Sequence, residues 1–221
     1  MEYIDKSPLF KKLEKEEIEV QLAAVGAVKK FYEKDSYIFV QEDYPEKLYV
    51  LVEGSVAVSN IEEDGKRTIV NIFKESGTVF GEVYVFMENR MYDYSCVALT
   101  DSVVLEIPKE EFLDYKNWDE PFVKVMIRNM INVLSQKAFY LNTKNLILSE
   151  LTLRQKLMRF FQQNEQNGKV ILKYNREELA DYLGTTRPSV SREINKMKKE
   201  CLIDVRGKIV YLLKKGEDRD E

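Results

Sequence analysis

Side chains suited to nucleic-acid recognition gather near the carboxyl end of the 221-residue chain. Four of them recur every two to four positions: Arg187, Ser189, Arg192 and Lys196. An arginine can bond guanine O6 and N7 through two N–H groups, and a serine can bond a base or a phosphate. The apolar residues between them follow the i, i+4, i+7 spacing of a buried helix face: Val190, Ile194 and Met197. The segment therefore predicts a helix that presents hydrogen-bond donors to DNA.

A second predicted helix must position the first. Asn175 and Glu178 have the spacing of a capping box, and Gly184 suits the left-handed position after a last helical turn. Residues 185–186 would then connect to the helix over 187–199. Two helices joined by a short turn that contains glycine indicate a helix-turn-helix.

Flanking elements favour the winged form of this motif. We expect a helix over 151–163, a strand at 170–172 and a hairpin with strands at 202–205 and 209–212. Arg206 and Lys208 at the hairpin tip would contact the DNA backbone. Residues 149–216 carry a net charge of +7, whereas residues 1–148 carry −8, so the acidic pI of 5.3 hides a basic segment.

Alternatives for the basic residues stay open at this stage. Arg192 could form a solvent-exposed ion pair with Glu193 or Glu200. For Lys196 and its neighbours at 198 and 199, plain solvation or non-specific attraction to phosphates explains the sequence as well.

The amino-terminal half has the pattern of a closed β unit. Strands are expected at 37–40, 48–52, 55–58, 68–72 and 102–107, separated by turn signals such as Asp64-Gly65. Residues 7–10 and the charged stretch after them predict a short helical cover. Beyond this unit, Pro121 can begin a helix that continues without glycine or proline to about Leu148.

An apolar heptad seam runs along that long helix. Its positions include Ile127, Ile131, Leu134, Ala138 and Leu141. The seam predicts a parallel dimer interface. The alternative is an ordinary helix packed against its own domain.

Composition excludes many kinds of enzyme. The chain has no histidine, so Ser-His-Asp and Cys-His catalysis, histidine zinc sites and histidine-ligated haem are all excluded. We expect no catalytic residues, no metal and no cofactor. Cys96 and Cys201 lie far apart in the sequence, which suits a reducing cytoplasm, and no apolar run is long enough to span a membrane.

With these motifs in this order, the chain resembles the CRP/FNR family of bacterial transcription regulators. The resemblance covers residues 8–213 and is carried by 48–58, 77–82 and 176–207. It implies an α+β protein. Residues 1–115 would form a cyclic-nucleotide-binding-like β-roll that senses an effector, 116–148 a dimerisation helix, and 149–221 a winged helix-turn-helix.

The resemblance also assigns roles in DNA binding. It implies a homodimer on a pseudo-palindromic operator, with RNA polymerase as a further partner. Arg187 and Arg192 match the family's base-contacting arginines, and Ser189 matches a site that contacts a phosphate or a base. The positions that match backbone contacts are Thr152, Arg176 and Thr186. Pro188 departs from the family, which often has a cytosine-reading glutamate there, so we expect a different operator.

The sensory region departs further from the cyclic-AMP binders. Gly81 and Glu82 are kept, but Tyr92-Asp93 stands where an Arg-Ser pair would hold the cyclic phosphate. We therefore expect a small organic effector other than cyclic AMP. Gly81, Glu82, Tyr92 and Asp93 would line one side of its site, with Phe139 and Tyr140 on the other. Dimer packing explains the last two equally well, and a regulator without any effector would have the same sequence pattern.

A function from another class remains as the alternative. The β-roll could bind a small molecule while the basic carboxyl-terminal domain contacts a protein or a membrane. Salt-dependent binding to promoter DNA would separate the two.

Overall fold

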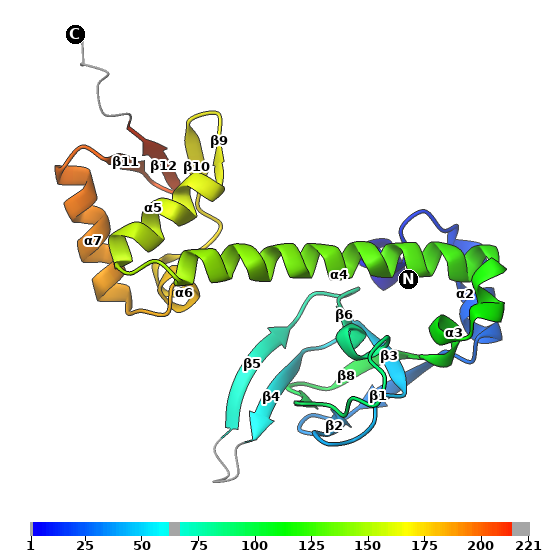
Figure 1. The fold of residues 1–221 in the computed structure, drawn as a ribbon. Coiled ribbons are helices and arrows are strands. Elements are labelled where there is room, and N and C mark those ends of the chain that lie inside the picture. Colours follow the sequence, from blue (N-terminus) through cyan, green and yellow to red (C-terminus); the bar gives the residue numbers. More distant parts are fainter. Residues whose placement is uncertain (1, 62–66, 214–221) are drawn as a thin grey trace. The chain divides into compact units, whose positions relative to one another are not determined.

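The computed structural model describes residues 2–61 and 67–213, and the chain divides into two compact units, Met1–Lys137 and Ala138–Glu221 (Figure 1). The first contains a β-roll with helical cover, and the second contains three helices and a small sheet. The α+β fold class expected from the sequence is confirmed.

Two four-stranded antiparallel sheets form the β-roll. One has the order β1-β8-β3-β6 and the other β2-β7-β4-β5. The strands are β1 (Val28–Tyr32), β2 (Tyr37–Phe39), β3 (Lys47–Glu53), β4 (Val56–Ile61), β5 (Arg67–Phe73), β6 (Val79–Phe80), β7 (Ser95–Ala98) and β8 (Ser102–Pro108). All five strands expected from the sequence are present. Strands β1, β6 and β7 are not among the predicted strands. Two lysines weaken the signal of β1, Ser95-Cys96 weakens that of β7, and β6 is only two residues long.

Alternation along the strands divides this unit into two cores. On β3, Leu48 and Val50 pack toward the helices, whereas Tyr49 and Leu51 face the interior between the sheets. Stacked rings fill that interior: Phe39 lies 4.1 Å from Tyr92 between ring centroids, and Tyr49 lies 5.3 Å from Phe80. The roll is therefore closed by its own aromatic side chains.

Short helices cover the core that contains Leu48 and Val50. They are α1 (Glu2–Lys6), the 3₁₀ turn η1 (Pro8–Phe10) and α2 (Lys15–Ala24) before the strands, η2 (Glu82–Tyr84) among them, and α3 (Glu110–Leu113) and η3 (Tyr115–Asp119) after them. The cover expected after residue 7 is confirmed. Asn129, buried on the long helix, donates from Nδ2 to the Leu9 and Lys11 carbonyls at 2.8 and 2.7 Å, which attaches the cover to that helix.

The long helix α4 spans Pro121–Leu148, the bounds that the sequence predicts, and it passes from the first unit into the second. In the first unit its buried face comprises Phe122, Val123, Met126, Met130 and Val133. The predicted seam lies beside this face. Ile127 and Leu134 pack in part against the β-roll core, whereas Ile131 and Leu141 are 57% and 61% exposed.

The second unit has the predicted order of elements, with one further short strand, β9, that the sequence did not predict. After the end of α4 come α5 (Leu153–Gln163), β9 (Glu165–Gln166), β10 (Lys169–Ile171), α6 (Arg176–Tyr182), α7 (Arg187–Lys199), β11 (Ile203–Arg206) and β12 (Ile209–Leu212). The sheet order is β11-β12-β10-β9. Leu157, Phe161 and Ile194 belong to one buried core beneath the three helices. Helix α5 begins two residues later than expected because Thr152 is its N-cap.

Candidate nucleic-acid interface and sensory cassette

Local hydrogen bonds fix the start of α7. Thr186 is the N-cap, and its hydroxyl accepts from the Ser189 backbone N–H at 3.4 Å. The hydroxyls of Thr186 and Ser189 lie 2.9 Å apart. Pro188 in the first turn removes an N–H that has no partner within the helix. Both hydroxyls thus lie at the positive end of the helix dipole, where a phosphate is favoured.

The two arginines of α7 are exposed and carry no ion pair among residues 2–61 and 67–213. Arg192 donates from Nε only to the Pro188 carbonyl, at 3.3 Å. The alternative ion pair with Glu193 or Glu200 is wrong, because both glutamates are bound by another residue. Both arginines are therefore solvent-exposed, and Arg192, two residues after the buried Val190, lies on the opposite side of α7.

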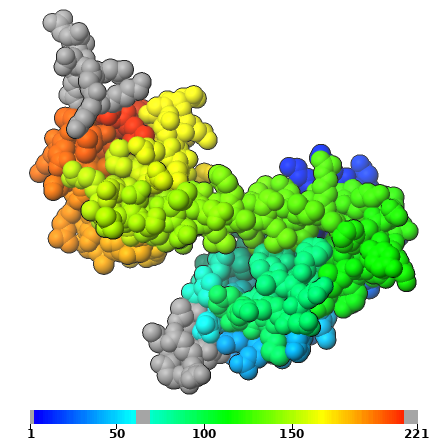
Figure 2. Space-filling model, viewed as in Figure 1, coloured from blue at the N-terminus to red at the C-terminus, as the bar shows by residue number. Residues whose placement is uncertain are grey.

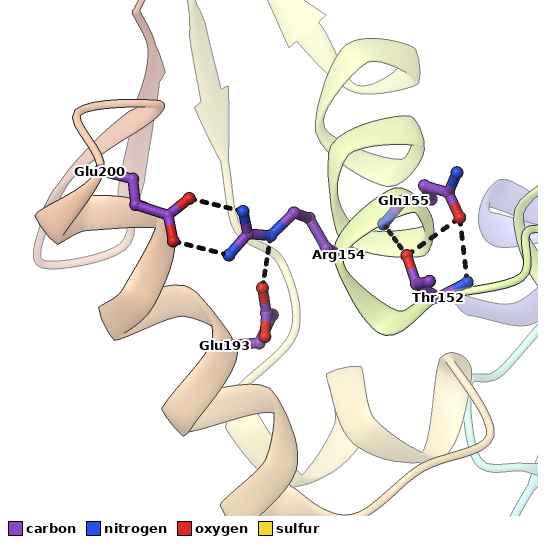
Figure 3. A network of polar contacts seen from close by, with 5 residues as sticks. All are labelled: Thr152, Arg154, Gln155, Glu193 and Glu200. Carbon is purple, nitrogen blue, oxygen red and sulfur yellow. Dashed lines mark hydrogen bonds and ion pairs between the residues drawn. The ribbon is translucent and has the colours of Figure 1, made fainter.

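That other residue is Arg154 on α5 (Figure 3). Its Nε donates to Glu193 at 2.6 Å, and its Nη1 and Nη2 donate to the two Glu200 oxygens at 2.5 and 3.0 Å. These bonds raise the pKa of the Arg154 guanidinium and hold the pKa of Glu200 below its usual range. Sequence reasoning missed Arg154, because its partners lie 39 and 46 residues away.

The expected backbone contacts occupy helix starts. Thr152 caps α5 in a reciprocal capping box with Gln155, which Figure 3 shows. Arg176 begins α6, and burial lowers its pKa. Its Nη1 is buried and has no hydrogen-bond acceptor within the part of the chain that the structure describes. The three predicted phosphate contacts, Thr152, Arg176 and Thr186, thus lie one at each of the three helix starts in this unit.

The β11–β12 hairpin forms the wing. Arg206 donates from Nε to Asp204 at 2.9 Å and lies 5.5 Å from the Tyr211 ring centroid. Lys208 at the turn is exposed. In the space-filling view, the orange surface of α6 and α7 adjoins the red surface of this hairpin (Figure 2).

In the sensory cassette, which comprises the expected effector residues Gly81, Glu82, Tyr92 and Asp93, other side chains of the chain fill the space at Gly81 and Glu82. Gly81 has a φ of +75°, and a Cβ there would lie 2.9 Å from the Tyr49 ring. Glu82 is almost fully buried, and Lys137 of α4 donates to it at 2.8 Å and to the Val79 carbonyl at 3.1 Å. A lysine of the chain itself therefore pairs with the carboxylate that was expected to bind an effector.

Asp93 has charged and polar partners nearby. Arg90 donates to it at 2.6 Å and the Tyr84 hydroxyl at 3.2 Å, and these bonds hold the Asp93 pKa below its usual range. Tyr92 is buried in the aromatic core, and burial raises its pKa to about 12. An open hollow of about 700 Å³ includes Tyr92 and Asp93 but not Gly81 or Glu82, and its lining is Gln41, Glu42, Asn60 and 89–94.

Phe139 and Tyr140 belong to the second unit. Phe139 is 75% exposed, and Tyr140 packs edge-on against Tyr182. Their expected position opposite Gly81 and Glu82 stays a prediction. Within residues 2–61 and 67–213, no three acidic or sulfur side chains gather to hold a metal. Of the described helices, none is both long and apolar enough to cross a membrane.

Two family models match separate parts of the chain. Residues 29–117 match the cyclic nucleotide-binding domain, and residues 153–215 match the Crp-like helix-turn-helix domain. The first match covers the β-roll and the second covers the three-helix unit with its wing.

Curated relatives are similar across both parts. A global nitrogen regulator of Nostoc sp. is 24% identical over 192 residues, which are 83% of this chain and 84% of the relative. A cAMP-activated global transcriptional regulator of Salmonella typhimurium is 26% identical over 189 residues, which are 82% and 87%. Among solved structures, the catabolite activator protein of Thermus thermophilus has the same fold, with a TM-score of 0.52, 21% identity and 93% of each chain covered.

Proposed function

Because the chain belongs to the CRP/FNR family of transcription regulators and has its helix-turn-helix DNA-binding domain, we propose that it binds a pseudo-palindromic operator as a homodimer. Helix α7 of each subunit enters a major groove, and the two grooves lie about one helical turn apart. The observation that carries this proposal is the pair of exposed arginines on α7, Arg187 and Arg192, neither of which pairs with Glu193 or Glu200 because Arg154 binds those two carboxylates.

The other side chains of the second unit support phosphate contacts. Thr152, Arg176 and Thr186 each lie at a helix start, and Ser189 shares the first turn of α7 with Thr186. Lys196 on α7, with Arg206 and Lys208 on the wing, adds positive charge toward the backbone. Pro188 has no side-chain donor or acceptor, so the base pair opposite it is read by shape or by a neighbouring residue.

The exposed seam of α4 supports dimerisation. Ile131, Ala138 and Leu141 are solvent-exposed in the single chain, and an apolar stripe of this length on a regulator's helix is a candidate interface. Ile127 and Leu134 are partly covered by their own β-roll, so the carboxyl-terminal part of the seam contributes most to the dimer.

The effector is a small organic molecule other than cyclic AMP. Asp93 stands where a phosphate would need a donor, and its carboxylate would repel the phosphate instead. A ligand with hydrogen-bond donors suits the hollow that includes Tyr92, Asp93 and Glu42. Such a ligand acts by binding one state of the regulator more tightly than the other. RNA polymerase is the further partner that follows from this class of regulator.

Selection from a random DNA pool tests the proposed function. The full chain should enrich a sequence with twofold symmetry, and the enriched duplex should be bound in a strongly salt-dependent way. Repeating the selection with cell extract or with small-molecule fractions tests for an effector. Enrichment of a single half-site, or no enrichment at all, would contradict the dimeric operator.

A further inference from the structure

The ion pairs of Arg154 indicate a role in DNA binding beyond joining two helices. We infer that Arg154 neutralises the carboxylates of Glu193 on α7 and of Glu200, the C-cap of α7, and thereby keeps Lys196 available to DNA. The inference rests on the proposed placement of α7 in the major groove. Arg154 itself contacts no base in this scheme, so it is a positioning residue.

The geometry suits a guanidinium alone. Three nitrogens of Arg154 serve two glutamates, and both Glu200 oxygens are engaged (Figure 3). The planar fork of an arginine can do this, whereas a lysine presents a single point charge. The side chains of Arg154, Glu193 and Glu200 are 32%, 22% and 39% exposed, so water screens these pairs only in part.

The carboxylates have another partner on their own helix. Residues three or four positions apart are neighbours on a helix surface, and Lys196 lies three after Glu193 and four before Glu200. Lys196 already helps to lower the pKa of Glu200. Without Arg154, both glutamates would therefore compete with DNA for Lys196.

The uncompensated charges would also act on DNA directly. Glu193 directly follows Arg192, and a helix rises about 1.5 Å per residue, so Glu200 lies about 6 Å along the axis from Lys196. Each glutamate is thus separated from a basic residue of α7 by less than the Debye length, which is about 10 Å at 0.1 M salt. Loss of Arg154 would thus place two negative charges close to the phosphates that α7 approaches, whatever the base sequence.

A rescue experiment on the full chain tests the inference. Binding is measured by fluorescence anisotropy on the selected operator and on a scrambled duplex of equal length. Arg154→Gln should lower the affinity for both duplexes by about tenfold, because the freed carboxylates repel any phosphate backbone. Adding Glu193→Gln and Glu200→Gln should return the affinity to within about threefold of the wild type, since no negative charge is then left to neutralise.

Arg159→Gln is the matched control. Arg159 lies on the same helix, and its nearest ion-pair partner is Glu150 at 3.7 Å rather than a residue of α7. The control removes the same charge and should change the affinity by less than about threefold. Thermal unfolding of every variant identifies those that fail to fold. If Arg154→Gln does not fold, Arg154→Lys replaces it, with a smaller loss that the two glutamine substitutions remove.

Two results would overturn the inference. One is an affinity that stays low after both glutamates are replaced, which would mean that Arg154 only holds α5 against α7. The other is an unchanged affinity of Arg154→Gln. Failure of the proposed function is a different result: the wild type would bind operator and scrambled duplex equally, while loss and rescue would still be measurable on both.

Discussion

The two units use the same ion-pair chemistry with opposite results for their functional surfaces. In the first unit, Lys137 binds the buried Glu82, and the expected ligand carboxylate is thereby occupied. In the second unit, Arg154 binds Glu193 and Glu200, and the donors of α7 are thereby left exposed. Ion pairing therefore engages the expected ligand carboxylate in the first unit, and it leaves the arginines of the predicted DNA-binding helix unpaired in the second. The functional effect of an ion pair thus depends on which neighbouring side chains it leaves exposed.

Burial explains part of this difference. Glu82 is nearly inaccessible to water, and a buried carboxylate must be paired because its desolvation is costly. Arg187 and Arg192 face solvent, where an unpaired guanidinium remains hydrated at little cost. We predict that charge changes in the first unit alter mainly stability, whereas charge changes on α7 alter mainly DNA binding.

The largest expected effect is that of Arg192→Ala. Loss of a bidentate base contact should cost about 1–3 kcal/mol per half-site, and about twice that for the dimer. Anisotropy on the selected operator measures the loss, and thermal unfolding should be unchanged. Lys199→Ala is the control and should weaken operator and scrambled duplex alike, by a small factor. Equal operator affinity of Arg192→Ala and wild type would end the proposed role.

Substitution in the seam should have the next largest effect. Leu141→Glu places a charge in the exposed part of the predicted interface and should yield monomers that have lost most of their operator affinity. Leu134→Glu should give the same result with reduced stability, because Leu134 also packs in part against the β-roll core. Sedimentation at micromolar concentration measures the assembly. A wild-type chain that sediments as a monomer would contradict the dimer.

Lys137→Gln tests the closed cassette. The substitution leaves the buried Glu82 without its cation and should lower the free energy of unfolding by about 2 kcal/mol. Lys137→Gln combined with Glu82→Gln should recover much of that loss, because no buried charge then remains. Denaturant unfolding provides the measurement. A stability loss that the second substitution does not reduce would show that Lys137 acts through packing alone.

The Arg154–Glu200 pair predicts a dependence on pH. The folded-state pKa of Glu200 is below its ordinary value, so its contribution to stability is present above the ordinary pKa and lost as the pH falls through the lowered pKa. The difference in melting temperature between wild type and Arg154→Gln should therefore shrink in acid. A difference that does not change between neutral pH and pH below the glutamate range would contradict this assignment.

The smallest expected signal is that of cyclic AMP. Calorimetry should detect no tight binding, because Asp93 places a carboxylate where the cyclic phosphate would bind and engages the nearby Arg90, and Glu82 is already paired with Lys137. A dissociation constant in the micromolar range would overturn this argument. In that case Phe139→Ala and Tyr140→Ala would show whether α4 contributes to the ligand site or only to packing.

Local signals in the sequence determined much of the second unit. The capping box of Asn175 and Glu178, the glycine at 184 and the apolar spacing of 190, 194 and 197 act within one or two helical turns. Runs of β-branched and aromatic residues between turn signals likewise identified five strands of the β-roll, and Pro121 marked the first residue of α4. Short-range patterns are sufficient where a structure is stabilised by neighbours in the sequence.

The tertiary structure alone decided which charged groups are free. Arg154 donates to Glu200, 46 residues away in the sequence, and Lys137 donates to Glu82, 55 residues away. Lys47 likewise donates to Glu106, 59 residues away, at 2.6 Å. No periodicity encodes such pairs, because ion pairs depend on where the fold brings side chains together. The sequence determined that this chain has a helix-turn-helix whose second helix carries hydrogen-bond donors, and that a β-roll precedes it. The fold decided that the donors of this helix remain exposed and that the Glu82 carboxylate of the β-roll pairs with Lys137 of the same chain.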